Sequence, residues 1–222
     1  MKTILVVAAH TDDEALGCGG TIARHVAEGD SVFAVFMADG VTSRSQADQN
    51  DLANRNCAAE KAREILGIRE NFYLGLPDIR LDSIPLIEVI QHLEPIIRKL
   101  KPSIIYTHHH GDLNVDHRIT HHAVLTACRP MPGSSVQAIY AFEVMSSTEW
   151  ATPFAEPFVP NHYVDISGQL GKKLEALGAY QLEMREVPHS RSVEHLVHLA
   201  RHRGYTVGLF AAEAFVTVRT LQ

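Results

Sequence analysis

Apolar and polar stretches alternate along this chain in a pattern that predicts strands separated by helices. Continuous apolar runs, typical of strands buried on both faces, occupy residues 3–9, 31–38 and 103–107. The segments between them carry apolar residues at helical spacing, and glycines such as Gly29 and Gly67 follow as stop signals. The expected helices are residues 16–28, 49–66, 84–100, 117–128, 168–183 and 192–203, and further strands are expected at 71–74, 137–144 and 163–166.

Strands that alternate with helices imply a mostly parallel sheet covered on both faces, because parallel strands need a crossover connection. The expected fold class is therefore α/β, a Rossmann-like three-layer αβα sandwich. At 222 residues, a single domain over residues 1–222 is expected. Polar stretches at 39–48 and 152–161 are expected to be loops, and the first of them to be mobile.

Composition narrows the class of partner. The formal net charge of −6 leaves no basic surplus to neutralise phosphates, so nucleic acid is not an expected partner. The first apolar run is too short for a signal peptide, and no run reaches the length of a membrane span, so stable membrane insertion is not expected. Three widely spaced cysteines argue against a disulfide framework and favour the reducing cytoplasm.

Two clusters of chemically reactive side chains follow buried strands. The first runs from His10 to Glu14 and places one imidazole beside three carboxylates. The second, residues 108–117, combines four histidines with two aspartates. In an open parallel sheet, the loops after the strands lie at one edge, outside the carboxyl ends. Both clusters, and the Asp39-Gly40 turn after the second strand, are therefore expected to lie together.

The residue types in these clusters suit a zinc site. Catalytic zinc keeps three protein ligands and one open position. His10 and Asp13 can converge from one turn, and His117 from the other loop would complete the set. Asp12 could then accept a proton from water at the metal, and Asp116 could orient a ring. The same donors also suit Fe(II), Mn or Co.

Simpler explanations fit each motif taken alone. A His-x-x-Asp spacing at a strand end is more often a helix cap or a surface pair than a metal site. The histidines at 108–110 cannot all point one way from an extended segment, so one or two should face solvent or pack. The glycines of residues 17–20 lack the spacing of a phosphate loop, and close packing of a helix on the sheet explains them better.

At these residues the chain resembles the LmbE-like, or PIG-L, family of zinc-dependent N-acetylglucosaminyl deacetylases. The family's opening signature AHPDDE stands here as Ala9-His10-Thr11-Asp12-Asp13-Glu14. The other motifs that carry the resemblance are residues 17–21, 39–40, 55, 66–67, 74–78, 112–117, 188–192 and 212–215. The resemblance covers almost the entire chain and implies an LmbE-like fold.

The resemblance also implies a role for most candidate residues. The implied metal ligands are His10, Asp13 and His117. Asp12 is the implied general base, and Asp116 the aspartate that supports catalysis. The residues predicted to bind substrate are Arg55, His189 and Arg191. Family members are often trimers or hexamers, so a homo-oligomer is expected.

Two positions depart from the family pattern. Thr11 replaces a proline that would restrict the turn before the carboxylates. Asn114 replaces a histidine of better-known members, three residues before the metal-binding histidine. Asparagine can donate a hydrogen bond to an oxyanion, which is the catalytic role predicted for Asn114, but it cannot act as an acid. The acid must then be Asp12 itself, or one of His108, His109 and His189.

The hypothesis that follows is metal-dependent amide hydrolysis. Its predicted substrate is an N-acetylated amino sugar, as a glycoside, sugar nucleotide or glycolipid, and its products are acetate and a free amine. A deacylase of a non-sugar acetamide is a second possibility. A catalytically silent sugar-binding module is a third, although a binding module has no use for a free base beside a metal.

Overall fold

The structure is a computed structural model that describes residues 1–43, 49–152 and 156–221. Its strands are β1 (Thr3–Ala8), β2 (Ser31–Ala38), β3 (Glu70–Leu76), β4 (Ile104–His108), β5 (Ala138–Phe142), β6 (His162–Asp165) and β7 (Ala212–Thr220). Within the described residues these seven strands form one sheet in the order β3-β2-β1-β4-β5-β7-β6. Neighbours from β3 to β5 are parallel, whereas β7 is antiparallel to both β5 and β6.

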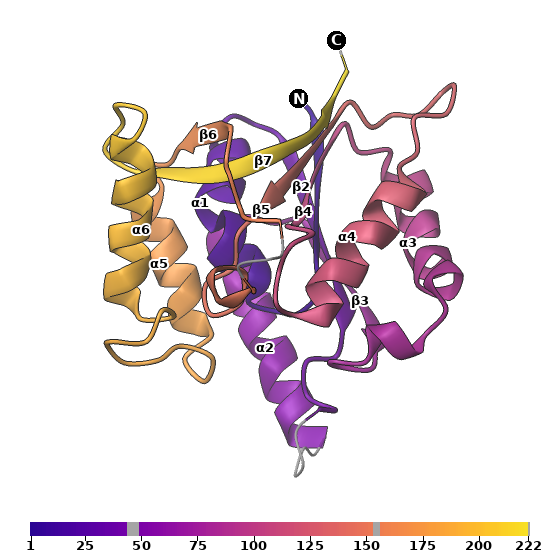
Figure 1. Cartoon of the computed structure of the whole chain (residues 1–222), viewed down its shortest axis with the longest axis horizontal. Helices are drawn as coiled ribbons and strands as arrows, with labels where there is room; N and C mark the ends of the chain where they lie inside the picture. The colour runs from indigo at the N-terminus through magenta and orange to yellow at the C-terminus, as the bar shows by residue number, and fades with distance from the viewer. Residues whose placement is uncertain (44–48, 153–155, 222) are drawn as a thin grey trace.

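Helices cover both faces of this sheet and make three layers (Figure 1). They are α1 (Asp13–Ala27), α2 (Gln49–Leu66), α3 (Leu86–Leu100), α4 (Val115–Ala127), α5 (Leu170–Ala179) and α6 (Val193–Tyr205), with short 3-10 turns η1 (Leu81–Ser83) and η2 (Thr148–Trp150). Apolar residues of α1, α2, α5 and α6 pack on one face, with Phe36 and Phe215 of the sheet. Residues of α3 and α4 pack on the other face, with Val35 and Ile105.

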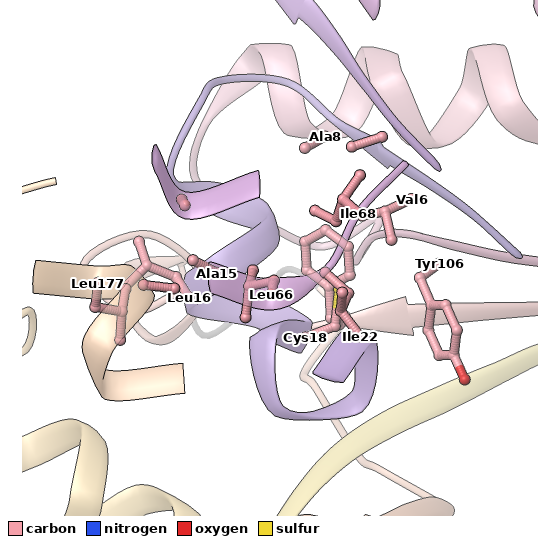
Figure 2. Packing of buried hydrophobic residues seen from close by; sticks show 14 of the residues in the cluster. Val6, Ala8, Ala15, Leu16, Cys18, Ile22, Leu66, Ile68, Tyr106 and Leu177 are labelled. Atoms are coloured by element: carbon pink, nitrogen blue, oxygen red, sulfur yellow. The ribbon is translucent and has the colours of Figure 1, made fainter. Parts of the chain in front are cut away.

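The alternation of side chains along each strand explains why the two large apolar clusters lie on opposite faces of the sheet. Successive residues of a strand point to opposite faces. Ile4, Val6 and Ala8 of β1 therefore join one cluster, and Leu5 and Val7 join the other. Figure 2 shows Val6 and Ala8 in the first cluster, close to the ribbon of α1. No helix in the described part of the chain is long and apolar enough to cross a membrane.

The α/β sandwich predicted from the sequence is confirmed, with one strand missed. The bounds of β2 and α2 match the prediction, and the other predicted elements differ by a few residues. Strand β7 was not predicted, because the buried acid Glu213 interrupts the apolar pattern of its Ala-Glu-Ala-Phe sequence. The loops predicted at 39–48 and 152–161 lie partly outside the described residues.

A buried ion pair holds α1 where it breaks. Cys18 has φ −146° and ψ 24°, outside the helical region, so the second half of α1 has its own N-terminus. The carboxylate of Glu213 accepts the amides of residues 20 and 21 there, at 3.0 and 2.6 Å. Lys173 Nζ donates to Glu213 Oε1 at 2.6 Å and to the Leu16 carbonyl at 2.8 Å. Strand β7 and helix α5 are thereby bound to both halves of α1.

We expect Glu213→Ala to lower the free energy of unfolding by about 3–5 kcal/mol, because it leaves the buried Lys173 ammonium without its partner. Urea unfolding measures this loss. The double variant Glu213→Leu/Lys173→Met removes both charges and should recover part of the stability. A loss below about 1 kcal/mol in the single variant, the range of exposed ion pairs, would contradict the structural role of this pair.

Candidate active site

The two reactive clusters lie together at the carboxyl edge of the sheet. Strand order changes direction between β1 and β4, and ligands of open α/β sheets bind at such a switch point. His10 follows β1, Asp13 is the first residue of α1, and His117 lies in the first turn of α4. Their exposed fractions are 7%, 0% and 1%. Polar groups buried this deeply need partners or a ligand.

His10, Asp13 and His117 direct their ligand atoms toward one point. His10 Nδ1 and His117 Nε2 each lie 3.3 Å from Asp13 Oδ2, and the ligand atoms of all three lie within 4.8 Å of one another. Among the described residues, His117 Nε2 and Asp13 Oδ1 are buried without a well-aligned hydrogen bond. Two imidazole nitrogens and a carboxylate in this arrangement fit a divalent metal such as zinc.

Two carboxylates orient the far nitrogen of His10. His10 Nε2 lies 3.1 Å from Asp116 Oδ2 and 3.0 Å from Asp78 Oδ1. Asp116 is itself fixed, because it accepts the amides of Ile79 and Leu81 at 2.7 and 3.0 Å. These acceptors favour the proton on Nε2, which leaves Nδ1 free to bind a metal. Asp116 thus contacts the far nitrogen of the His10 ring, and its role in orienting that ring for a metal stays a prediction.

Asp112 orients His117 in the same way. Asp112 Oδ1 lies 3.1 Å from His117 Nδ1 and accepts the Ser147 hydroxyl, while Oδ2 accepts the Thr148 hydroxyl at 2.6 Å. Burial opposes ionisation of Asp112, but His117 and the hydroxyls lower its pKa to about 2. Burial also opposes the charge on His117, but Asp13 and Asp112 raise the pKa of His117 to about 9. The carboxylates therefore favour positive charge at this point, which a metal ion would supply.

Asp12 lies beside the predicted ligands in a strained conformation. Its φ of 114° is in the left-handed region that non-glycine residues rarely adopt, and the residue is 2% exposed. Arg191 Nη1 donates to Asp12 Oδ2 at 2.9 Å, and Arg55 Nη2 lies 3.5 Å from Asp12 Oδ1. Burial raises the pKa of Asp12, and the two arginines offset part of that rise. A carboxylate with a raised pKa is suited to accept a proton.

Arg191 connects Asp12 to a second predicted residue, His189. Arg191 Nε donates to Ser146 Oγ at 2.6 Å, and the Arg191 amide donates to His189 Nδ1 at 3.0 Å. The His189 ring is edge-on to Trp150, with ring centroids 5.5 Å apart. Trp150 is 51% exposed, so this side of the site presents an aromatic surface to solvent.

The histidines considered as the general acid differ in accessibility. His108 is fully buried, its Nε2 accepts the Ala9 amide at 2.8 Å, and burial lowers its pKa. His109 is 1% exposed, its Nε2 lies 3.0 Å from the Glu156 carbonyl, and burial lowers its pKa too. His189 is half-buried, and because its Nδ1 accepts an amide, its Nε2 is the nitrogen that can carry a proton. Of the three, His189 is the most accessible to solvent.

Asn114 has a structural contact in addition to its predicted catalytic role. Its Oδ1 accepts the Asp116 amide at 2.8 Å and caps the N-terminus of α4. Its role at an oxyanion stays a prediction.

The sequence analysis assigned no role to Asp78 or Asp112, although both follow strands at the same edge and belong to motifs that carry the family resemblance. A carboxylate shortly after β3 or β4 was the signal that could have identified them.

Fold and site together define an α/β protein with a buried candidate metal centre at the carboxyl edge of its sheet. Residues 5–128 match the model of the PIG-L family, described as GlcNAc-PI de-N-acetylase, and the chain belongs to this family. A relative from Bacillus cereus, a probable N-acetyl-alpha-D-glucosaminyl L-malate deacetylase 2, is 32% identical over 189 residues, 81% of this chain and 83% of the relative. The solved structure of a conserved protein from Thermus thermophilus is 26% identical in sequence and superposes with a TM-score of 0.79. The superposition covers 100% of this chain and 97% of the Thermus thermophilus chain.

One relative is named for a different reaction. The 4-oxalmesaconate hydratase of Pseudomonas putida is 25% identical over 197 residues, 79% of this chain and 72% of the relative. The Bacillus cereus and Pseudomonas putida relatives are thus named as enzymes, and the family model and the Bacillus cereus relative are named as deacetylases of N-acetylglucosamine derivatives. An assay of function has to distinguish deacetylation from hydration.

Proposed function

We propose that this protein is a zinc-dependent hydrolase that removes the acetyl group from an N-acetylated amino sugar. The observation that carries the proposal is the buried set of His10, Asp13 and His117 with Asp12 beside it. A divalent metal held by these three residues would supply a Lewis acid that polarises the acetamide carbonyl and lowers the pKa of water. Another divalent transition metal would suit the same donors.

Side chains of the protein carry out the proton transfers of the proposed reaction. Asp12 takes a proton from the water that attacks the acetamide carbon, so that a C–O bond forms and the π electrons move to the carbonyl oxygen. Asn114 is proposed to donate a hydrogen bond to this oxyanion. A proton then reaches the amide nitrogen as the C–N bond breaks, which yields acetate and a free amine. We assign this last delivery to His189, because it is the accessible histidine of the candidates. Asp12 then releases its proton to solvent and His189 takes one up from solvent, which restores both groups.

The substrate class is proposed from the relatives and from the side chains at the rim of the site. The family model and the Bacillus cereus relative are both named for N-acetylglucosamine derivatives. Trp150 is half exposed beside His189, and the apolar C–H face of a pyranose ring can pack on such an indole. Arg191 beside it supplies a hydrogen-bonding group for sugar hydroxyls.

A substrate panel tests this proposal. Zinc-loaded protein is expected to release acetate from N-acetylglucosamine glycosides with kcat/KM about 100-fold above that for acetylated amino acids or polyamines, since sites that bind hydroxyls discriminate against ligands without them. Acetate and free amine are quantified together. Faster turnover of acetylated polyamines would favour the non-sugar deacylase. Sugar binding without turnover would favour the silent module, and hydration of an unsaturated tricarboxylate without acetate release would favour the hydratase reaction.

A further inference from the structure

Arg55 reaches the site from α2 and is held there by Thr11. Its Nε donates to the Thr11 side-chain hydroxyl at 2.8 Å, and its Nη2 donates to the Thr11 carbonyl at 2.8 Å. Thr11 is 2% exposed, and the Arg55 side chain 9% exposed, so water competes little for these bonds. One residue of the loop between β1 and α1 thus engages two nitrogens of a single guanidinium.

The remaining contacts leave this guanidinium little freedom. Arg55 Nη1 donates to Glu183 Oε1 at 2.7 Å, so all three nitrogens have partners within the protein. Arg55 also passes close over Gly40, where φ is +70° and a Cβ would lie 2.5 Å from Arg55 Nε. Glycine at position 40 therefore provides the space through which Arg55 reaches Thr11. An arginine confined in this way holds the groups that it contacts in place.

The confined Arg55 guanidinium lies beside Asp12, the proposed base, and holds its side chain in place. Asp12 follows Thr11 directly and has a strained backbone, so its side chain depends on outside support. Arg191 holds Asp12 Oδ2 and is anchored in turn by Ser146. Arg55 faces the other oxygen, Oδ1, at 3.5 Å, and Thr11 is its anchor on that side.

We propose that Thr11 is a positioning residue, whose hydroxyl fixes Arg55 against Asp12 Oδ1 and so orients the base for proton transfer. A backbone carbonyl is present at this position whatever the residue, but only a side-chain acceptor can take the Arg55 Nε–H. The proline of the family signature has no such acceptor, so this contact belongs to the sequence of this chain. The proposal rests on the proposed function, because it assigns Asp12 as the base.

Thr11→Val tests the hydroxyl alone, since valine has nearly the shape of threonine but accepts no hydrogen bond, and Thr11→Ser is the matched control that keeps the hydroxyl. We expect Thr11→Val to lower kcat about tenfold, with KM and zinc content within about twofold of wild type, because it removes one hydrogen bond to a charged group. Thr11→Ser should stay within about twofold of the wild-type kcat. An unchanged kcat in Thr11→Val would overturn the proposal. So would a raised KM at constant kcat, because Arg55 would then act on substrate binding.

A double-mutant cycle asks whether Thr11 acts through Arg55. In an Arg55→Gln background, Thr11→Val should lower kcat less than about twofold further, because its partner is already gone. A full tenfold further loss would show independent effects and contradict the proposal. The same four proteins are compared by urea unfolding, where the Thr11→Val loss should likewise shrink in the Arg55→Gln background. If the wild type releases no acetate, the proposed function fails. If the losses of unfolding free energy in Thr11→Val and Arg55→Gln simply add in the double variant, the Thr11–Arg55 contact is refuted, whatever the activity.

Discussion

Replacing Asp12 by asparagine is expected to lower kcat by about 10²–10⁴-fold, the usual contribution of a general base. Asparagine has nearly the same shape, and its amide oxygen can still accept the hydrogen bond that Arg191 donates at 2.9 Å. What it cannot do is take a proton from the attacking water. Acetate release at saturating substrate measures the effect.

Two controls separate this loss from a loss of structure or metal. Zinc content should match the wild type, because Asp12 is not one of the predicted ligands. The midpoint of urea unfolding should fall, because the variant removes the charge that the partly buried Arg55 and Arg191 guanidiniums face, so activities are compared where both proteins are fully folded. The neighbouring variant Asp13→Asn should behave differently and lose zinc, since Asp13 Oδ2 lies 3.3 Å from both ligand nitrogens. Full activity in Asp12→Asn would remove Asp12 as the base.

Removing the third ligand is expected to have the second large effect. His117→Ala should abolish stoichiometric zinc binding and bring acetate release to background, because the set then has two protein ligands instead of three. Asp112→Asn should weaken zinc binding about 10–100-fold, since it removes only the carboxylate that orients the His117 ring. Zinc titration with a competing chelator measures both.

A histidine outside the site provides the control for these variants. His92 is exposed on α3, and His92→Ala should keep zinc binding and activity at wild-type levels. Zinc affinity should be highest in His92→Ala, lower in Asp112→Asn and lowest in His117→Ala. A metal bound elsewhere would keep the same affinity in all three variants. Retention of one tightly bound zinc by His117→Ala would show that the metal ligands lie elsewhere.

The sequence predicted those parts of the molecule that depend on short-range patterns and on sheet geometry. Buried apolar runs identified β1, β2 and β4, and the rule that parallel strands place their following loops at one edge brought His10 and His117 together across more than a hundred residues. A candidate ligand set could be named because metal chemistry restricts the residue types, and its role in binding a metal stays a prediction. Strand β7 was not predictable, since the groups that satisfy the acid on its buried face come from α1 and α5.

The supporting contacts of the site were beyond sequence reasoning for a related reason. Asp78 and Asp112 are ordinary carboxylates in loops, and it is the folding of the chain that brings the His10 and His117 rings beside them. The contact between Thr11 and Arg55 spans 44 residues and depends on the path of α2 over Gly40. Such contacts follow from tertiary packing, which no local pattern encodes.

The place of β7 in the sheet also bears on how the protein acquires activity during synthesis. β7 lies between β5 and β6, and the contact between Asp12 and Arg191 joins residues 179 positions apart. A ribosome releases the chain from its N-terminus, so the predicted metal ligands emerge long before the strand that joins β6 to the sheet. Contacts of such high sequence separation form slowly. Catalytic competence would therefore arise after translation has passed residue 220, and a nascent chain would carry the metal ligands before it could turn over substrate.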